Sequence, residues 1–255
     1  MRNLSRLLIL LSTAVSVAVA QQSPQRDAAA IQILQDSFAQ LGGGQKAAIR
    51  DFRIEGTVAS AAAPDKPTGT FVAKSRGDDF SFELTRNGET TSYKVLKGRG
   101  SFRAQGKTTA LQPFNTSGLG LDVFPILSRW TEFLRQETKV DAPVTVQYAG
   151  SPHVLIHIAS EPREKDESTA NNHSEFDLIV DPATRLLAAI RFKGSFGPYS
   201  GDRLEVENQF SNYRTVSGLP MPTRITRVLN GQPMLVLSVT SVRFNSGLAD
   251  SDFVN

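Results

Sequence analysis

Two of the three histidines could in principle share a metal ion. His153 and His157 lie four residues apart in a segment that alternates apolar and polar residues in the manner of a β-strand. At about 3.3 Å per residue, their Cα atoms would be roughly 13 Å apart on one face of that strand. This distance is too long for two imidazoles to bind one ion. We therefore expect ordinary histidines on a sheet surface, with neither a metal nor another cofactor.

Two glutamates have a spacing that acid–base chemistry could use. Glu205 and Glu207 alternate along one predicted strand, beside Arg203. Side chains two positions apart on a strand lie roughly 6.6 Å apart, which would in principle allow a pair of catalytic carboxylates. Carboxylates that flank a substrate normally come from different elements, however. We therefore interpret this pair as part of a solvated outer face.

Two glycine-containing motifs resemble loops of known enzymes. The run Gly42 to Gly44 follows a predicted helix instead of joining a strand to a helix, so it is typical of helix termination and not of a phosphate loop. Ser200, between Gly197 and Gly201, is one position out of register with a serine nucleophile elbow. No arrangement argues for catalysis. We predict that the protein is not an enzyme, because an enzyme would require distant residues to meet in one pocket.

The first twenty residues have the pattern of a cleavable secretory signal peptide. Arg2 and Arg6 give a positive start, Leu7 to Val19 is an apolar stretch, and residues 18–20 supply the small-x-small cleavage pattern. The apolar stretch is shorter than the about 20 residues that a membrane span needs. We therefore expect an exported protein in which residues 21–255 form one soluble domain.

Composition excludes several classes of protein. The formal net charge is only +3, of which Arg2 and Arg6 contribute two, and no basic stripe with interleaved aromatic residues is present, so we expect no nucleic-acid partner. The chain has no cysteine. Its stability must therefore come from a core and not from disulfides, and a lipid anchor on an N-terminal cysteine is excluded.

Most of the chain alternates apolar and polar residues with a period of two, which predicts about eleven antiparallel strands. Asn87-Gly88 and Asn230-Gly231 are strong signals for tight hairpins. The apolar parity changes near Thr240 or Ser241, which predicts a β-bulge there. Bulges and glycines bend sheets, so we expect a curved sheet.

Two segments have helical spacing. Asp27 can cap a helix with apolar residues at 31, 34, 38 and 41, and Asp122 can cap a second helix that includes Leu134. An apolar sheet face needs a cover in a soluble protein. The predicted fold class is therefore mostly β with α (α+β): a curved antiparallel half-barrel with two or more helices over its concave face.

This order of elements resembles the LolA/LolB superfamily of periplasmic lipoprotein carriers, over nearly all of residues 21–255. Gly69 to Phe80 resembles the carrier strand that ends in Arg-Pro-x-x-Phe, with Gly77 in place of the proline. Phe176 to Phe192, with its Asp181-Pro182 turn, resembles the family's paired strands, and Val242 to Phe253 resembles its terminal strand. The resemblance implies that Arg76 corresponds to the arginine that holds the carrier's helical lid, and Phe80 to an aromatic residue linked to cargo.

The resemblance implies a non-enzymatic periplasmic carrier or binding protein for a lipid or for the acyl chains of a lipoprotein. We expect a monomer that can also contact an inner- or outer-membrane protein. The alternative is a cell-envelope sensor or interaction module with the same fold. The side chains predicted to bind lipid, from the resemblance and from the apolar faces, are Arg76, Phe80, Phe82, Leu84, Phe102, Phe124, Leu127, Trp130, Ile156, Leu178 and Leu237.

Overall fold

The computed structural model describes residues 25–43, 49–111, 134–136, 138–160, 175–194 and 204–255. Its elements are α1 (Ala28–Gln40), β1 (Phe52–Ser60), β2 (Pro67–Arg76), β3 (Asp79–Arg86), β4 (Glu89–Leu96), β5 (Arg99–Ala104), β6 (Lys107–Leu111), β7 (Thr138–Val140), β8 (Val144–Tyr148), β9 (Ser151–Ser160), β10 (Glu175–Val180), β11 (Leu187–Gly194), β12 (Leu204–Val216), β13 (Leu219–Leu229), β14 (Gln232–Phe244) and the 3₁₀ helix η3 (Asp250–Phe253).

The prediction of a mostly β fold with an antiparallel sheet is confirmed, but two of its details need correction. The described residues form fourteen strands instead of about eleven, because short segments such as β6 and β7 carry too little apolar alternation to be recognised. In the described ranges there is a single α-helix and not two or more. The segment 122–133 of the second predicted helix lies outside those ranges, as do residues 1–20 and the segment around Ser200.

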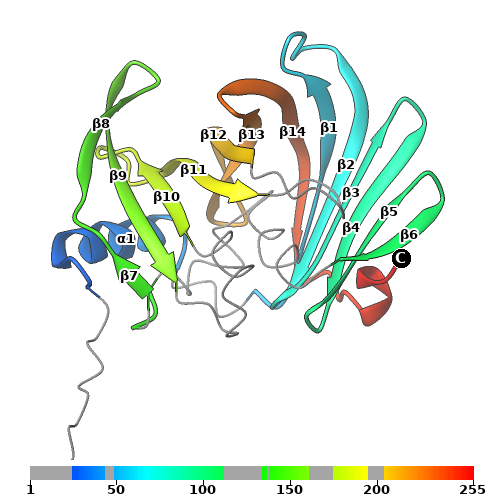
Figure 1. Cartoon of the computed structure of the whole chain (residues 1–255), viewed down its shortest axis with the longest axis horizontal. Helices are drawn as coiled ribbons and strands as arrows, with labels where there is room; N and C mark the ends of the chain where they lie inside the picture. Colours follow the sequence, from blue (N-terminus) through cyan, green and yellow to red (C-terminus); the bar gives the residue numbers. More distant parts are fainter. Residues whose placement is uncertain (1–24, 44–48, 112–133, 137, 161–174, 195–203) are drawn as a thin grey trace, which may run out of the picture.

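All fourteen strands belong to one antiparallel sheet, in the order β6-β5-β4-β3-β2-β1-β14-β13-β12-β11-β10-β9-β7, with β8 also paired to β9. Neighbours along this order are also neighbours in sequence except at β1–β14 and β7–β9. Figure 1 shows that the sheet curves into an open half-barrel. We call β1–β6 the first arm and β7–β11 the second arm.

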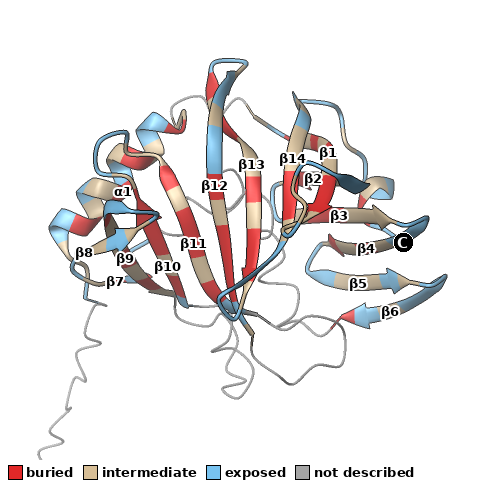
Figure 2. Ribbon diagram, turned by 90° about the horizontal axis from the view of Figure 1, so that it is seen from above, coloured by how far each residue is buried: buried red, intermediate tan, exposed pale blue. Residues whose placement is uncertain are grey.

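The cross-strand register gives the sheet an apolar and a polar face. Residues directly opposite on paired strands point to the same side, so Phe71, Leu84 and Gly56 share one face, while Lys74 and Ser81 share the other. The apolar side chains of the first face form one continuous buried cluster that runs through both arms. Figure 2 shows buried positions along the central strands. The apolar face lines the inside of the curve, and we call it the inner face.

Local backbone geometry explains the hairpins and the curvature. Asn87 and Gly88 have φ angles of 49° and 81°, and Asn230 and Gly231 have 46° and 76°, so both predicted hairpin turns have the left-handed backbone that such tight turns require. The predicted bulge is also confirmed. Glu55 pairs with Ser241 but Gly56 pairs with Val239, which leaves Thr240 as the extra residue. A bulge of this kind bends its strand and increases the twist of the sheet.

Helix α1 packs on the inner face of the second arm. The side chain of Asp27 accepts a hydrogen bond from the backbone N of Ala30 at 2.9 Å, which confirms the predicted cap. Leu34 is fully buried in the inner-face cluster, and the Asp27 backbone N donates to the Val140 carbonyl of β7 at 2.9 Å. Gly42, with φ of 82°, ends the helix so close to β13 that a Cβ atom there would lie 2.0 Å from Leu219 Cδ2.

Candidate lipid-binding face

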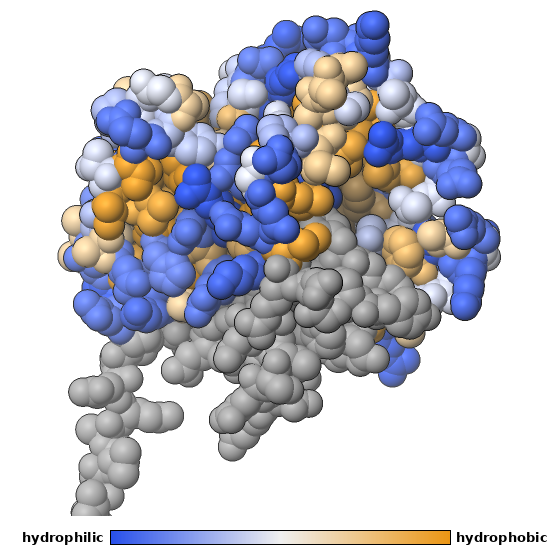
Figure 3. Space-filling view, turned by 45° about the horizontal axis from the view of Figure 1, so that its top comes forward, coloured by the Kyte–Doolittle hydropathy of each residue, from blue (hydrophilic) through white to orange (hydrophobic). Residues whose placement is uncertain are grey.

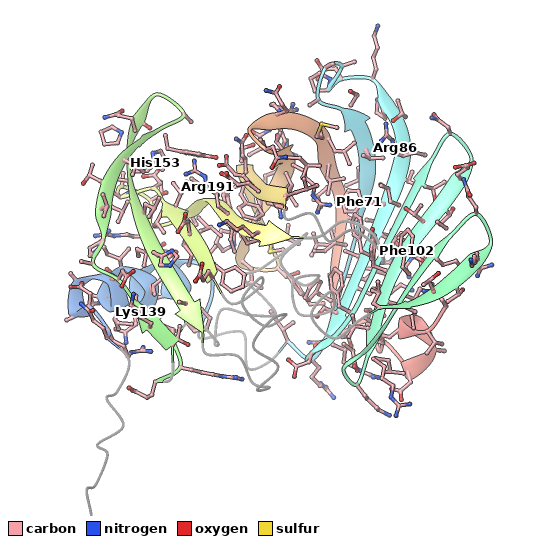
Figure 4. The ribbon with its side chains drawn as sticks, viewed as in Figure 1. Phe71, Arg86, Phe102, Lys139, His153 and Arg191 are labelled. Carbon is pink, nitrogen blue, oxygen red and sulfur yellow. The ribbon has the colours of Figure 1, made fainter. Side chains whose placement is uncertain are left out.

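Aromatic side chains from neighbouring strands gather on the inner face of the first arm. The Phe71 and Phe82 rings, on β2 and β3, have centroids 6.1 Å apart, and the Tyr93 and Phe102 rings, on β4 and β5, have centroids 4.6 Å apart. Phe71, Phe80 and Phe82 are buried, while Tyr93 and Phe102 are half-buried. Figure 4 shows Phe71 and Phe102 on the side of the first arm that faces the second. The result is an apolar surface without a charged group at its centre.

Small residues lie beside these large ones on the inner face. Gly56 lies directly opposite Phe71, and a Cβ atom on it would lie 2.6 Å from the Phe71 ring. Gly69 and Ala73 flank Phe71 on the same face of β2. Figure 3 shows apolar side chains gathered between the two arms, where the surface recedes, with hydrophilic side chains around the rim.

The described elements cover the two arms unequally. Helix α1 lies under the second arm, well away from β1–β6 (Figure 1). In the described part of the chain, no helix lies on the inner face of the first arm; η3 contacts β3 and β4 from the outer face instead. No helix among the described residues is both long and apolar enough to cross a membrane.

Seven of the predicted lipid-binding residues lie on the inner face of the described sheet, in three groups. The inner face of the first arm carries Phe80, Phe82, Leu84 and Phe102, the centre of the sheet carries Leu237, and the second arm carries Ile156 and Leu178. Ile156 and Leu178 are paired across β9 and β10 and are fully buried in the same cluster that takes in α1. Phe124, Leu127 and Trp130 lie outside the described residues. A role in binding stays a prediction for all of them.

Arg76 lies on the outer face, away from Phe80. Its Nη2 donates to Asp79 Oδ2 at 2.7 Å and to Asp250 Oδ1 at 2.5 Å, and its guanidinium lies 5.1 Å from the centroid of the Phe253 ring. Hydrogen bonds to Asp79 and Asp250 raise the pKa of Arg76 above its usual value. In this structure Arg76 therefore holds the C-terminal 3₁₀ helix against the outside of the first arm.

Sequence reasoning missed two arginines that belong to the inner face. Arg86 continues the parity of Phe82 and Leu84 on β3, and its Nε is buried with no hydrogen-bond partner among the described residues. Arg227 follows Ile225 at the same parity on β13 and is 8 % exposed. The signal was present in the sequence, because in each case a charged residue occupies a position that the alternation assigns to an apolar one.

The glutamates considered for catalysis lie on the outer face, but Glu207 is buried and not solvated as expected. Its carboxylate accepts hydrogen bonds from Tyr148 Oη at 2.8 Å, from Gln209 Nε2 at 2.7 Å and from Arg191. Burial favours a higher pKa for Glu207, but these hydrogen bonds, led by that of Arg191, lower it below its usual value. A general acid needs a raised pKa, so Glu207 is suited to a structural ion pair.

The two histidines make separate contacts, also on the outer face. His157 Nδ1 lies 2.7 Å from Asp177 Oδ1, while the ring of His153 lies edge-on to Tyr148 with centroids 5.4 Å apart. His153 is 8 % exposed, so it is buried and not on the open sheet surface as expected. Among the described residues, no group of three or more His, Asp or Glu side chains is placed to hold a metal ion.

The described elements form an open antiparallel half-barrel with an apolar inner face and a helix packed against that face. Comparison with solved structures finds this fold in a putative outer membrane lipoprotein-sorting protein domain from Vibrio parahaemolyticus, at 13 % identity and a TM-score of 0.54, over 88 % of this chain and 96 % of that one. A LolA superfamily protein from Nitrosomonas europaea matches at 14 % identity and a TM-score of 0.54, over 89 % and 97 %.

A third structure with this fold is a DUF1329 family protein from Desulfovibrio piger, at 14 % identity and a TM-score of 0.52, over 88 % of this chain and 97 % of that one. No protein-family model matches the sequence, and neither does any curated protein. At these identities the comparisons establish the fold alone. The predicted resemblance to the LolA superfamily is thus confirmed at the level of the fold.

Proposed function

We propose that this protein binds the acyl chains of a lipid or lipoprotein on the inner face of its first arm and carries them without covalent chemistry. The observation behind this proposal is that the apolar inner face continues beyond the part that α1 covers in the described structure. Ligand sites in proteins are lined mostly by apolar and aromatic side chains, and this part of the inner face offers a row of them that no described helix occupies.

The free energy of burying an acyl chain is large enough for a carrier. Each buried CH₂ group contributes about 0.8 kcal/mol, so a sixteen-carbon chain that buries most of its length gains roughly 12 kcal/mol. Loss of translational and rotational freedom costs about 4 kcal/mol or more. The remainder, at most about 8 kcal/mol, corresponds to a dissociation constant of roughly 1 μM or weaker. Affinity in this range would hold a guest in water and still release it to a partner.

The shared fold adds support of a weaker kind. The Vibrio parahaemolyticus structure carries the name of a lipoprotein-sorting domain, which makes lipoprotein acyl chains a reasonable cargo to test first. One fold can serve unrelated functions. The comparison therefore guides only the choice of ligand to test, and the proposal itself rests on the apolar inner face. We also propose that residues 1–20 direct export to a periplasm and that residues 21–255 form a single binding domain.

Delipidated protein should bind a fluorescent fatty acid or a triacylated lipopeptide in a saturable manner, with a stoichiometry near one. We would monitor probe fluorescence and confirm the stoichiometry by native mass spectrometry. Absence of saturable binding, together with an interior filled by side chains, would contradict the proposal. The alternative, a sensor or interaction module, predicts capture of a membrane-protein partner by the lipid-free protein. Export predicts a periplasmic product whose intact mass corresponds to a chain that starts at Gln21.

A further inference from the structure

Arg86 lies at the end of an apolar row on the inner face. It follows Leu84 at the same parity of β3 and lies directly opposite Gly69, which has no side chain to cover it. Its Nε is buried and lacks a hydrogen-bond partner within the described ranges, which also contain no ion-pair partner for its guanidinium. Figure 4 places Arg86 near the upper end of the first arm, above Phe71 and Phe102.

This environment differs from that of the other arginine on the inner face. Arg227 Nε donates to Asn208 Oδ1 at 3.3 Å, and Asn208 is fully buried, so that pair belongs to the packed core of the sheet. Arg86 instead lies two residues before the Gly88 turn, at the rim where the first arm meets solvent. A partly buried guanidinium that has kept hydrogen-bonding capacity free is placed to receive a ligand from outside.

The chemistry of the guanidinium defines the ligand. It carries five N–H donors in a planar fork that matches the oxygen atoms of a carboxylate or a phosphate. Burial of a charged group without a partner is unfavourable, and charge-assisted hydrogen bonds to an anion remove that cost. Because the apolar row begins directly below Arg86, the anion and the acyl chain can belong to one molecule.

We propose that Arg86 binds the anionic head of an amphiphile, a carboxylate or a phosphate, whose acyl chain extends down the inner face past Leu84 and Phe82. This inference rests on the proposed function. It adds that the guest is anionic and that its head lies at the rim, with the acyl chain inside. Glu89, opposite Arg86 on β4, is the nearest carboxylate by register, yet no ion pair joins the two side chains in the described structure. Its negative charge at this register position disfavours a second anion beside Arg86.

The test compares two probes with the same apolar body: 11-(dansylamino)undecanoic acid and its methyl ester. The wild-type protein should bind the acid about tenfold or more tightly than the ester, because only the acid offers a charged acceptor. The affinity of Arg86→Gln for the acid should fall to its affinity for the ester. Its affinity for the ester should equal that of the wild-type protein. Arg86→Lys should retain part of the preference, and Glu89→Gln should strengthen binding of the acid.

The outcomes separate the two proposals. Equal affinity of wild-type protein for acid and ester, or an equal loss of both in Arg86→Gln with an unchanged circular dichroism spectrum, would overturn the role of Arg86 and leave acyl-chain binding in place. If neither probe binds, acyl-chain binding itself fails. To identify the source of the anion, lysophosphatidic acid and inorganic phosphate are added as competitors. Displacement by the lipid alone supports an amphiphile, whereas equal displacement by inorganic phosphate shows a free-anion site and contradicts the inference.

Discussion

Gly56 and Phe71 face each other across β1 and β2, and the ring of Phe71 occupies the space that a side chain at position 56 would need. A Cβ atom on Gly56 would lie 2.6 Å from the ring and 2.1 Å from the carbonyl oxygen of Ser238 on β14. This single contact therefore joins three strands at the centre of the sheet. It also holds one of the aromatic rings of the inner face in place.

Gly56→Ala should lower the free energy of unfolding by about 1–3 kcal/mol, because an added methyl group must displace the Phe71 ring or the backbone of β14. Urea denaturation followed by circular dichroism measures the change. Thr57→Ala, one residue along β1 on the outer face, is the matched control and should have a smaller effect. The double variant Gly56→Ala/Phe71→Leu should recover part of the loss, and strict additivity of the two changes would contradict the proposed clash.

Phe102→Ala should weaken binding of an uncharged acyl probe about tenfold, because the half-buried ring contacts Tyr93 and lines the inner face. Arg103→Ala is the control on the same strand. Arg103 is exposed and pairs with Ser92 on the outer face, so its loss should leave the affinity unchanged. Equal effects of the two substitutions would place the guest elsewhere.

Arg76→Ala should loosen the C-terminal segment without changing the affinity for acyl probes. Arg76 donates to the Leu248 carbonyl at 3.1 Å as well as to Asp250, and it covers Phe253 on the outer face. Amide hydrogen exchange should therefore increase at residues 248–253. If the affinity falls while exchange there stays the same, Arg76 acts on the cargo, as its correspondence to the carrier arginine implied.

Asp51 should contribute stability that depends on pH. Its carboxylate accepts hydrogen bonds from Ser246 N at 2.6 Å, Ser246 Oγ at 2.7 Å and Gly247 N at 3.0 Å. Burial favours a higher pKa for Asp51, but these hydrogen bonds lower it below its usual value. The stabilisation is thus fully present above the ordinary aspartate pKa of about 3.9 and is lost as the pH falls through the lowered pKa of the folded state.

Asp51→Asn should accordingly lower the free energy of unfolding by about 1–3 kcal/mol at pH 7. The difference between wild type and variant should shrink as the pH approaches 2. Urea titrations of both proteins at several pH values measure this difference. A difference that is independent of pH would show that the carboxylate charge has no part in holding the segment after β14.

The local pattern of the sequence predicts most of the strands and the hairpins that join them. Alternation marks the longer strands, and Asn87-Gly88 and Asn230-Gly231 mark turns whose backbone angles are as expected. The change of parity near Thr240 predicts the bulge. These features are local, since each depends on residues a few positions apart. The three-residue strand β7 has no such signal, because it is too short to show a period.

The faces of the sheet were harder to assign completely. The alternation of the sequence marks Phe80, Phe82 and Leu84 as one apolar row, and Arg86 at the end of that row has the same parity. The resemblance to the carriers implies a role for Arg76 on the cargo side. Its parity on β2, opposite to that of Phe71 and Ala73, indicates the outer face. The contacts of η3 depend on residues far apart in the chain, and no local pattern predicts them.

The pairing of β1 with β14 has a consequence for how the molecule forms. Phe52 lies directly opposite Phe244, so the middle of the sheet joins two segments that are far apart in the chain. Contacts between such distant residues form slowly, and here they cannot form until residues 232–244 have been synthesised. A nascent chain therefore lacks the pairing of β1 with β14 until β14 has been synthesised.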